Sequence, residues 1–318
     1  MKNIEEKRYW IWFSLIPNLN IRTKKRLLEI YKNPKSIFYA NKLKQIEYLG
    51  DNIVKKIQDS KKEEKIEAYI KIMKKENVDI VSIYDKDYPQ LLKNIYDFPI
   101  SLFIKGNKEN LNRRSVAIIG CRSASEYGKE AAKYFGYNLS KNGINIVSDL
   151  ERGVERYSLV GSICAKKEEN NQHVDNLSTY SNPIVVTNCI LDSSYIKENK
   201  DLEKEILNVG GTIISECLLE MKLNKYNFFA RNRIISGLSD GVVVVEAKKK
   251  SRELIIVDFA LEQGREVFVI PRKYKFCEFS WYKLFDKTRS KISYLLWRYF
   301  RRFIYEKNFE KVLTFIIK

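Results

Sequence analysis

Two arginines separated by one residue lie in the segment of this sequence most suited to binding chemistry, residues 225–239. Arg231 and Arg233 are notable because the chain has 17 Arg against 41 Lys. A guanidinium group holds a phosphate through two hydrogen bonds and stacks on nucleobases, which an ammonium group does not do. Lys225 and Phe228 come just before the pair, and aromatic rings beside cations are typical of sites for single-stranded nucleic acid. This segment is therefore a candidate nucleic-acid contact.

The same arginines also have a structural interpretation. Arg231 or Arg233 could pair with Glu246 or Glu216 and so hold a helix against a sheet. We expect one of the two arginines to have this structural role and the other to face a ligand.

Two further candidate phosphate sites follow short apolar runs that have the pattern of buried strands. The first run ends in Gly120, and Arg122 precedes a helix expected to begin near Glu126. Free N–H groups at a helix start, with an arginine beside them, suit a phosphate. The second run leads into Ser148 and Gly153, where a polar surface turn is an equally good interpretation. Neither loop has the spacing of a dinucleotide-binding or P-loop motif.

These loops require a scaffold, and the hydrophobic pattern predicts an α/β fold with a parallel sheet and helices on both faces. Short β-branched runs alternate with segments of helical spacing, which is the pattern of such a sheet. Parallel sheets bind ligands at the carboxyl ends of their strands, which is where the loops above lie. The expected strands are residues 116–119, 144–147, 184–186, 212–214, 241–245 and 266–270, and the expected helices between them include 126–141, 202–209 and 254–263.

The chain is expected to have four parts. Residues 1–76 have helical spacing throughout and form a helical N-terminal domain. Residues 77–110 are a connecting segment, and residues 111–275 form the α/β domain. Residues 276–318 form an aromatic tail with 10 basic and 4 acidic residues, whose amphipathic helices have no assigned role.

Composition excludes several classes of protein. The net charge of +18 favours a polyanionic partner such as nucleic acid. Five cysteines in no paired spacing argue against a disulfide framework or a zinc site and favour a reducing cytosol. His173 is the one histidine, so chemistry that requires a His base or several His ligands is excluded. No early apolar run is long enough to cross a membrane, and we expect a cytoplasmic protein.

The order of these segments resembles that of the bacterial DNA-processing protein A family (DprA, also called Smf). The resemblance covers roughly residues 87–271, which is over half of the chain. The segments that carry it are Tyr88-Pro89, Phe98-Pro99, Leu102–Gly106, Ile118–Arg122 with Tyr127-Gly128, Asn188–Asp192, Ile214–Glu216, Arg231–Ser239, Val244–Ala247 and Gly264–Pro271.

The resemblance implies an extended Rossmann-like fold behind a helical domain of sterile-alpha-motif type. It also implies a dimer that binds single-stranded DNA and helps to load the RecA recombinase during natural transformation, without catalysis, cofactor or metal. The DNA or phosphate pocket would consist of Gly120, Arg122, Ser148, Gly153, Lys225, Phe228, Arg231 and Arg233, and the motif positions with structural roles would be Asn232, Gly237, Ser239 and Glu246.

The sequence departs from the family pattern around the second loop. Asp149 and Glu151 stand where the family has small residues, and Leu159 stands at its His position. Like charge there should weaken the binding of a phosphate. The loop at residues 251–254 also differs, and the tail shows no winged-helix domain. These departures leave open a nucleotide-sensing protein on the same fold. A nucleotide hydrolase, with Glu246 as a lone acid, is less well supported.

Overall fold

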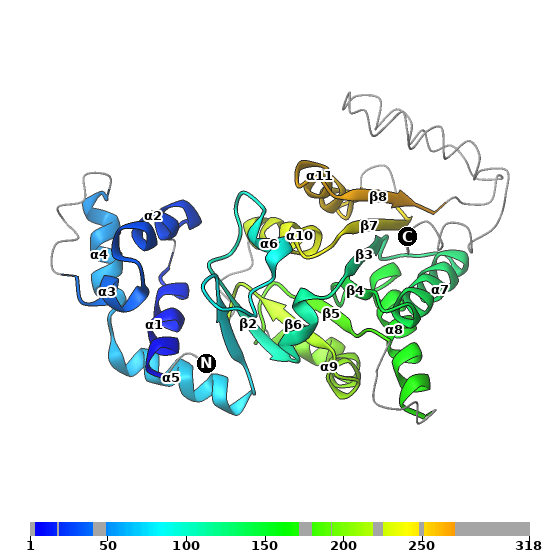
Figure 1. Ribbon diagram of the computed structural model, residues 1–318, viewed down its shortest axis with the longest axis horizontal. Helices are drawn as coiled ribbons and strands as arrows, with labels where there is room; N and C mark the ends of the chain where they lie inside the picture. Colours follow the sequence, from blue (N-terminus) through cyan, green and yellow to red (C-terminus); the bar gives the residue numbers. More distant parts are fainter. Residues whose placement is uncertain are drawn as a thin grey trace. The chain divides into compact units, whose positions relative to one another are not determined.

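The computed structural model describes residues 4–17, 19–40, 49–171, 180–191, 193–218, 225–247 and 251–270 (Figure 1). Within these ranges, the side chains at positions 4, 171, 193–198 and 225–228 are not described. The expected tail at 276–318 and His173 lie outside the described residues. Contacts divide the chain into two compact units. Unit 1 comprises Met1–Arg113 and Ile184–Leu238, and unit 2 comprises Arg114–Pro183 and Ser239–Lys318.

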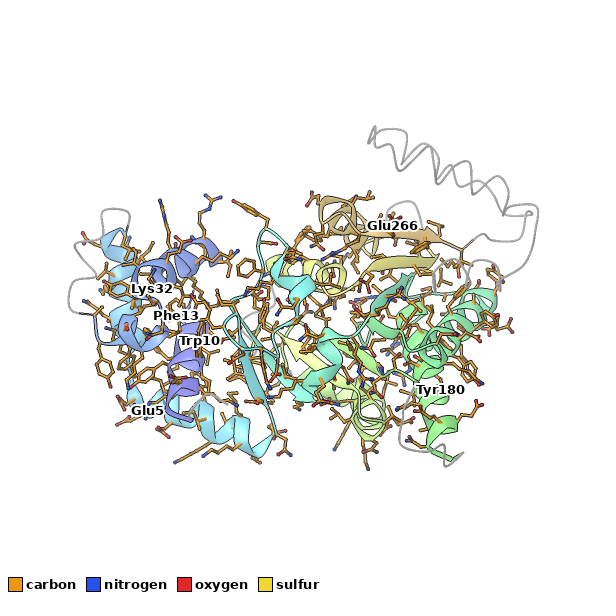
Figure 2. The ribbon with its side chains drawn as sticks, in the orientation of Figure 1. Glu5, Trp10, Phe13, Lys32, Tyr180 and Glu266 are labelled. Atoms are coloured by element: carbon orange, nitrogen blue, oxygen red, sulfur yellow. The ribbon has the colours of Figure 1, made fainter. Side chains whose placement is uncertain are left out.

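The N-terminal part of unit 1 is helical. Asparagine side chains cap two of its helices, because Asn20 accepts a hydrogen bond from the Thr23 amide and Asn33 accepts one from the Ser36 amide. Trp10 is 4% exposed and Phe13 is fully buried, and both lie among these helices (Figure 2). The helices are α1 (Ile4–Ser14), α2 (Ile21–Tyr31), α3 (Pro34–Phe38), α4 (Asp51–Ser60) and α5 (Glu63–Lys75).

The rest of unit 1 is built on four strands in the order β1-β2-β6-β5. Strand β2 pairs antiparallel with both β1 and β6, whereas β5 and β6 are parallel. The Asn110 side chain donates to Gly210 O at 2.9 Å and to Thr212 Oγ1 at 2.8 Å, which ties the segment after β2 to the start of β6. The elements are β1 (Asp79–Ser82), α6 (Gln90–Lys93), β2 (Ser101–Gly106), the 3-10 helix η2 (Lys108–Asn112), β5 (Pro183–Val186), α9 (Ser193–Asn208), β6 (Thr212–Ser215) and α10 (Lys225–Gly237).

Unit 2 has four parallel strands in the order β4-β3-β7-β8. Helices α7 and α8 pack on each other and on β3, β4 and β7, while α11 packs on β7 and β8. The core side chains Ile118, Phe135, Ile146 and Val243 are completely buried, as expected for strands covered by helices. The elements are β3 (Ser115–Gly120), α7 (Glu126–Lys141), β4 (Asn145–Ser148), α8 (Val154–Asn171), β7 (Gly241–Glu246), α11 (Leu254–Glu262) and β8 (Glu266–Val269).

The structure confirms the α/β fold class and all six strands expected in residues 116–270, which are β3 to β8. Strands β1 and β2 lie in the segment 79–106, which the sequence indicated to be strand-like, but their antiparallel pairing was not predicted. The five helices α1 to α5 lie within residues 4–75, where a helical domain was expected. The two compact units group the chain differently from the four parts expected from the sequence. The boundaries of those four parts stay a prediction.

Candidate nucleic-acid interface

In unit 2, the backbone amides of the turn that follows β3 are hydrogen-bonded to other groups of the same unit. The Cys121 amide donates to Glu246 O at 2.6 Å, and the Gly120 amide donates to Glu155 Oε1 at 3.2 Å. A Cβ atom at position 120 would lie 2.7 Å from Glu246 O and would overlap Val154. Gly120 is therefore required for close packing at the strand end.

Two amides at the start of α7 are bonded within the chain as well. Ser125 donates to Glu246 Oε2 from both its amide and its hydroxyl, each at 2.9 Å. The Ser125 hydroxyl in turn accepts from the Gly128 amide at 3.2 Å. The sequence predicted free N–H groups for a phosphate at this helix start. The Ser125 and Gly128 amides are bonded within the chain, and a phosphate contact here stays a prediction. Glu246 satisfies this helix start from within the chain.

Arg122 forms an ion pair with a carboxylate of the second loop. Its partner is Glu151, whose side chain is 12% exposed, whereas the Arg122 side chain is 60% exposed. The hydrogen bond that Arg122 donates to Glu151 is the main reason that the pKa of Arg122 is raised above its usual range. A carboxylate therefore binds the guanidinium group that the sequence assigned to a phosphate, and the group remains accessible to solvent.

Ser148 and Gly153 hold the two loops of unit 2 together. The Ser148 hydroxyl is fully buried and donates to Ile118 O at 3.0 Å. Gly153 has a φ of +88°, and a Cβ atom there would overlap the Cys121 carbonyl oxygen, so only glycine fits the position. The structure thus brings Gly120, Ser148 and Gly153 together, with packing roles in place of exposed ligand contacts.

A second feature of this loop pair is its buried acid groups. Glu155 is 3% exposed, and its Oε2 atom makes no hydrogen bond with any described residue. Burial, followed by repulsion from Asp149, raises the pKa of Glu155 well above its usual range, and Glu253 adds to the effect. The sequence analysis did not single out Glu155, because an acid in the first turn of a helix is ordinarily a solvated partner of the helix dipole.

In unit 1, Arg233 is held between two acids. Its Nη2 atom donates to Glu216 Oε2 at 2.6 Å, and its Nε atom lies 3.0 Å from Asp97 Oδ2. The residue is 6% exposed. The structural alternative, in which an arginine pairs with Glu216, is confirmed for Arg233. Asp97 was not predicted as a partner, because no sequence pattern indicates an ion pair between the loop before β2 and a helix more than 120 residues later.

The other arginine of α10 is buried as well. Arg231 is 3% exposed and its Nη2 atom donates to Asn232 Oδ1 at 3.4 Å. The expectation that it faces a ligand stays a prediction. Among the described side chains of this helix, the Phe229 ring is exposed to solvent, at 45%. Lys225 and Phe228 belong to α10, but their side chains lie outside the described residues.

The remaining motif positions serve packing. Asn232 and Ser239 are fully buried. At Gly237, a Cβ atom would lie 2.7 Å from the Leu92 side chain on α6, so glycine allows α10 to approach α6. The structure places Gly237 with the arginines in unit 1, whereas Ser239 and Glu246 belong to unit 2.

Two further features are absent from the described part of the chain. That part of the chain has no group of three or more His, Cys, Asp or Glu side chains arranged to hold a metal ion. None of its helices combines the length and the apolar character needed to cross a membrane.

Parallel strands joined by helices, with glycine turns and arginines after the strands, define unit 2 as a Rossmann-like α/β domain. This fold is of the α/β class in which ligands generally lie at the carboxyl edge of the sheet. A family model described as DNA recombination-mediator protein A matches residues 79–280. That match covers well over half of the chain, and the chain belongs to this family.

Curated relatives that are similar to this chain are named DprA or Smf. The DNA processing protein DprA of Bacillus subtilis is 36% identical over 208 residues, which are 65% of this chain and 65% of that protein. Protein Smf of Escherichia coli is 33% identical over 206 residues, or 65% of this chain and 51% of its own length. The DprA of Streptococcus pneumoniae is 37% identical over 190 residues, or 60% and 62%. The chain thus spans less than two thirds of each of these relatives.

Solved structures agree with the fold. The X-ray structure of DNA processing protein A from Streptococcus pneumoniae matches with a TM-score of 0.65 and 28% identity, over 87% of this chain and 89% of that one. A structure of DNA processing protein A from Helicobacter pylori, described for its single-stranded DNA binding mode, matches with a TM-score of 0.51 and 26% identity over 62% of this chain and 82% of that one.

Proposed function

We propose that this chain binds single-stranded DNA and acts as a recombination mediator without catalysis. The observation that carries the proposal is α10, where the exposed ring of Phe229 lies one turn before Arg233 on the same helix face. An exposed aromatic ring stacks bases in a manner that tolerates any sequence. The net charge of +18 supports a polyanionic ligand, and the Helicobacter relative is described as binding single-stranded DNA.

The family suggests the wider setting. We propose that the chain works in the cytoplasm as a homodimer and helps to load RecA onto single strands during natural transformation and recombination. The support for each of these points is membership of the recombination-mediator family.

The two units contribute unequally in this proposal. In unit 2, a DNA phosphate that approaches Arg122 has to displace Glu151, and it meets Asp149 and Glu253 nearby. Carboxylates beside a phosphate site weaken binding through repulsion. We therefore assign the main contact to α10 in unit 1 and a weaker, competed contact to Arg122.

The test is binding of the purified full chain to a labelled oligo-dT strand and to matched duplex across a salt series. Tighter binding of the single strand is expected, with an affinity that falls as salt rises. Phe229→Ala should weaken it by about 5- to 150-fold, the range for loss of one stacked base. Glu151→Gln should strengthen it, because a neutral amide no longer competes for Arg122.

A matched control is Tyr69→Ala, which removes a partly exposed ring beside Lys65 on α5 and should leave affinity unchanged. Arg231→Lys keeps the charge and loses the guanidinium fork, so a large loss of affinity would show a direct role for that arginine. Equal, weak binding of single strand and duplex that ignores Phe229 would refute the proposal. Small nucleotides would then be the next ligands to measure, as the nucleotide-sensing alternative requires.

A further inference from the structure

Tyr96 is the most exposed large hydrophobic side chain among the described residues of this chain, at 85% of its surface. It belongs to the segment between α6 and β2, in unit 1. Burial in the fold does not account for a ring that is exposed to this extent. Exposed aromatic rings at defined positions are common in binding sites.

Two cations of α2 hold this segment in place. The Arg22 Nη2 atom donates to the Tyr96 hydroxyl at 3.3 Å, and the Lys25 Nζ atom donates to the Tyr96 carbonyl oxygen at 2.7 Å. Lys25 Nζ also lies 3.4 Å from the centre of the Phe98 ring, a cation–π distance. The exposed ring is therefore fixed in orientation before any ligand arrives, which lowers the entropy cost of binding.

The surface around Tyr96 is cationic. Helix α2 contributes Arg22, Lys24, Lys25 and Arg26 against one acid, Glu29. Lys24 points toward the fold, because its Nζ atom donates to Ser14 O at 2.8 Å, and burial lowers its pKa to about 8. The other three cations are partly or fully exposed. Arg22 and Lys25 contact Tyr96, and Arg26 lies one helical turn after Arg22. An exposed ring beside cations matches the bases and phosphates of a single strand.

This surface connects to α10 through one residue. Asp97, next to Tyr96 in the chain, is the ion-pair partner of Arg233. Arg233 lies one helical turn from the exposed Phe229. The two exposed rings, Phe229 and Tyr96, are thus linked through the Arg233–Asp97 pair inside unit 1. Arg233 is shared between Asp97 and Glu216, so it offsets only part of the negative charge that would repel a phosphate.

We propose that Tyr96, Arg22, Lys25 and Arg26 form a second contact for single-stranded nucleic acid, in which a base stacks on Tyr96 and the α2 cations bind the flanking phosphates. This contact extends the strand from α10 toward the N-terminal helices, and it rests on the function proposed above. A strand that runs from α10 past the Arg233–Asp97 pair contacts both rings.

The experiment compares dT strands of about 6 and about 20 nucleotides, which bracket common site sizes. Tyr96→Ala should weaken binding of the long strand by about 5- to 150-fold, and that of the short strand by no more than this. Tyr96→Phe keeps the stacking surface and should retain most of the affinity. Arg22→Gln should lower the slope of log affinity against log salt by about 0.7, the value for one lost phosphate contact on a single strand.

A direct readout comes from a long strand that carries 5-iodouracil. Irradiation of its complex with the full chain should crosslink the peptide that contains Tyr96, and Tyr69→Ala should change neither the crosslink nor the affinity. The inference is overturned if Phe229→Ala weakens both strands while Tyr96→Ala weakens neither. If the unmodified chain binds single strand and duplex equally, the function proposed above is refuted. If Phe229→Ala still weakens binding of the single strand, only the second contact at Tyr96 is refuted.

Discussion

Arg233 of unit 1 and Arg122 of unit 2 both pair with glutamate, and the two pairs differ in burial. Arg233 is 6% exposed and lies between Glu216 and Asp97. The Arg122 side chain is 60% exposed and pairs with Glu151. A buried arginine between two acids holds segments of the fold together, whereas an exposed pair exchanges its partner at little cost.

The difference shows that a cation after a strand does not by itself identify a ligand site. Burial decides whether such a cation serves stability or remains available to a ligand. On this criterion, Arg122 is the available arginine, although its carboxylate neighbours oppose a phosphate. In unit 1 the groups exposed to a ligand are Phe229 and the exposed cations of α2, while the buried Arg233 holds the segments around them together.

The largest expected effect comes from Arg233→Ala. Removing the guanidinium group leaves Glu216 and Asp97 without their shared partner, and the free energy of unfolding should fall by about 3 kcal/mol. Denaturant unfolding of the full chain measures this change in the free energy of unfolding. Arg233→Lys, which restores one positive charge without the fork, should recover part of the loss. A decrease of less than about 1 kcal/mol would mean that the Arg233 ion pairs contribute no more than exposed surface ion pairs do.

An intermediate effect is expected at Glu155. Since its pKa is raised in the fold, the folded protein keeps a proton that the unfolded chain has released, once the pH is above the ordinary carboxyl pKa. The free energy of unfolding therefore falls as pH rises through the window between the two pKa values. Glu155→Gln removes this fall and should stabilise the protein by about 1–2 kcal/mol at neutral pH.

Thermal unfolding between pH 4 and pH 8 measures this effect. The control is Glu126→Gln, which neutralises an acid in the first turn of α7 whose side chain is 83% exposed. That variant should show the same pH dependence as the unmodified chain. An unchanged pH dependence in Glu155→Gln would mean that Glu155 is ionised in the fold.

The smallest effect is expected for Arg122→Ala, the counterpart of the Arg233 variant. An exposed ion pair contributes about 0–1 kcal/mol to stability, so the denaturation midpoint should hardly move. Affinity for a single strand is the sensitive measurement, and it should decrease by less than in Phe229→Ala. A loss of more than about 2 kcal/mol in stability would show that Arg122 and Arg233 play the same structural role.

The fold was largely predictable from the sequence. Strands β3 to β8 are short, β-branched and buried, so their apolar runs stand out against polar helices and glycine turns. Strands β1 and β2 were harder to predict, because their antiparallel pairing depends on partners far apart in the chain, such as Phe103 with Ser215. A local pattern does not encode such a register.

The site was only partly predictable. The positions of Gly120, Ser148 and Gly153 at strand ends follow from the alternating pattern. The hydrogen-bond partners do not, because Glu246 reaches Ser125 across 121 positions of the chain and Asp97 reaches Arg233 across a similar interval. Residue type indicates what a side chain can bind, but three-dimensional packing determines whether another residue of the same chain already occupies it.

The contact between Glu246 and the start of α7 limits how this sequence can change over evolutionary time. A Cβ atom at Gly128 would overlap Glu246 Oε2, so any larger residue at 128 displaces the carboxylate that also binds Ser125. Loss of the acid at 246 would in turn remove the reason for a glycine inside a helix, where glycine costs about 1 kcal/mol relative to alanine. The two positions are therefore constrained to change together, although 117 residues separate them in the chain.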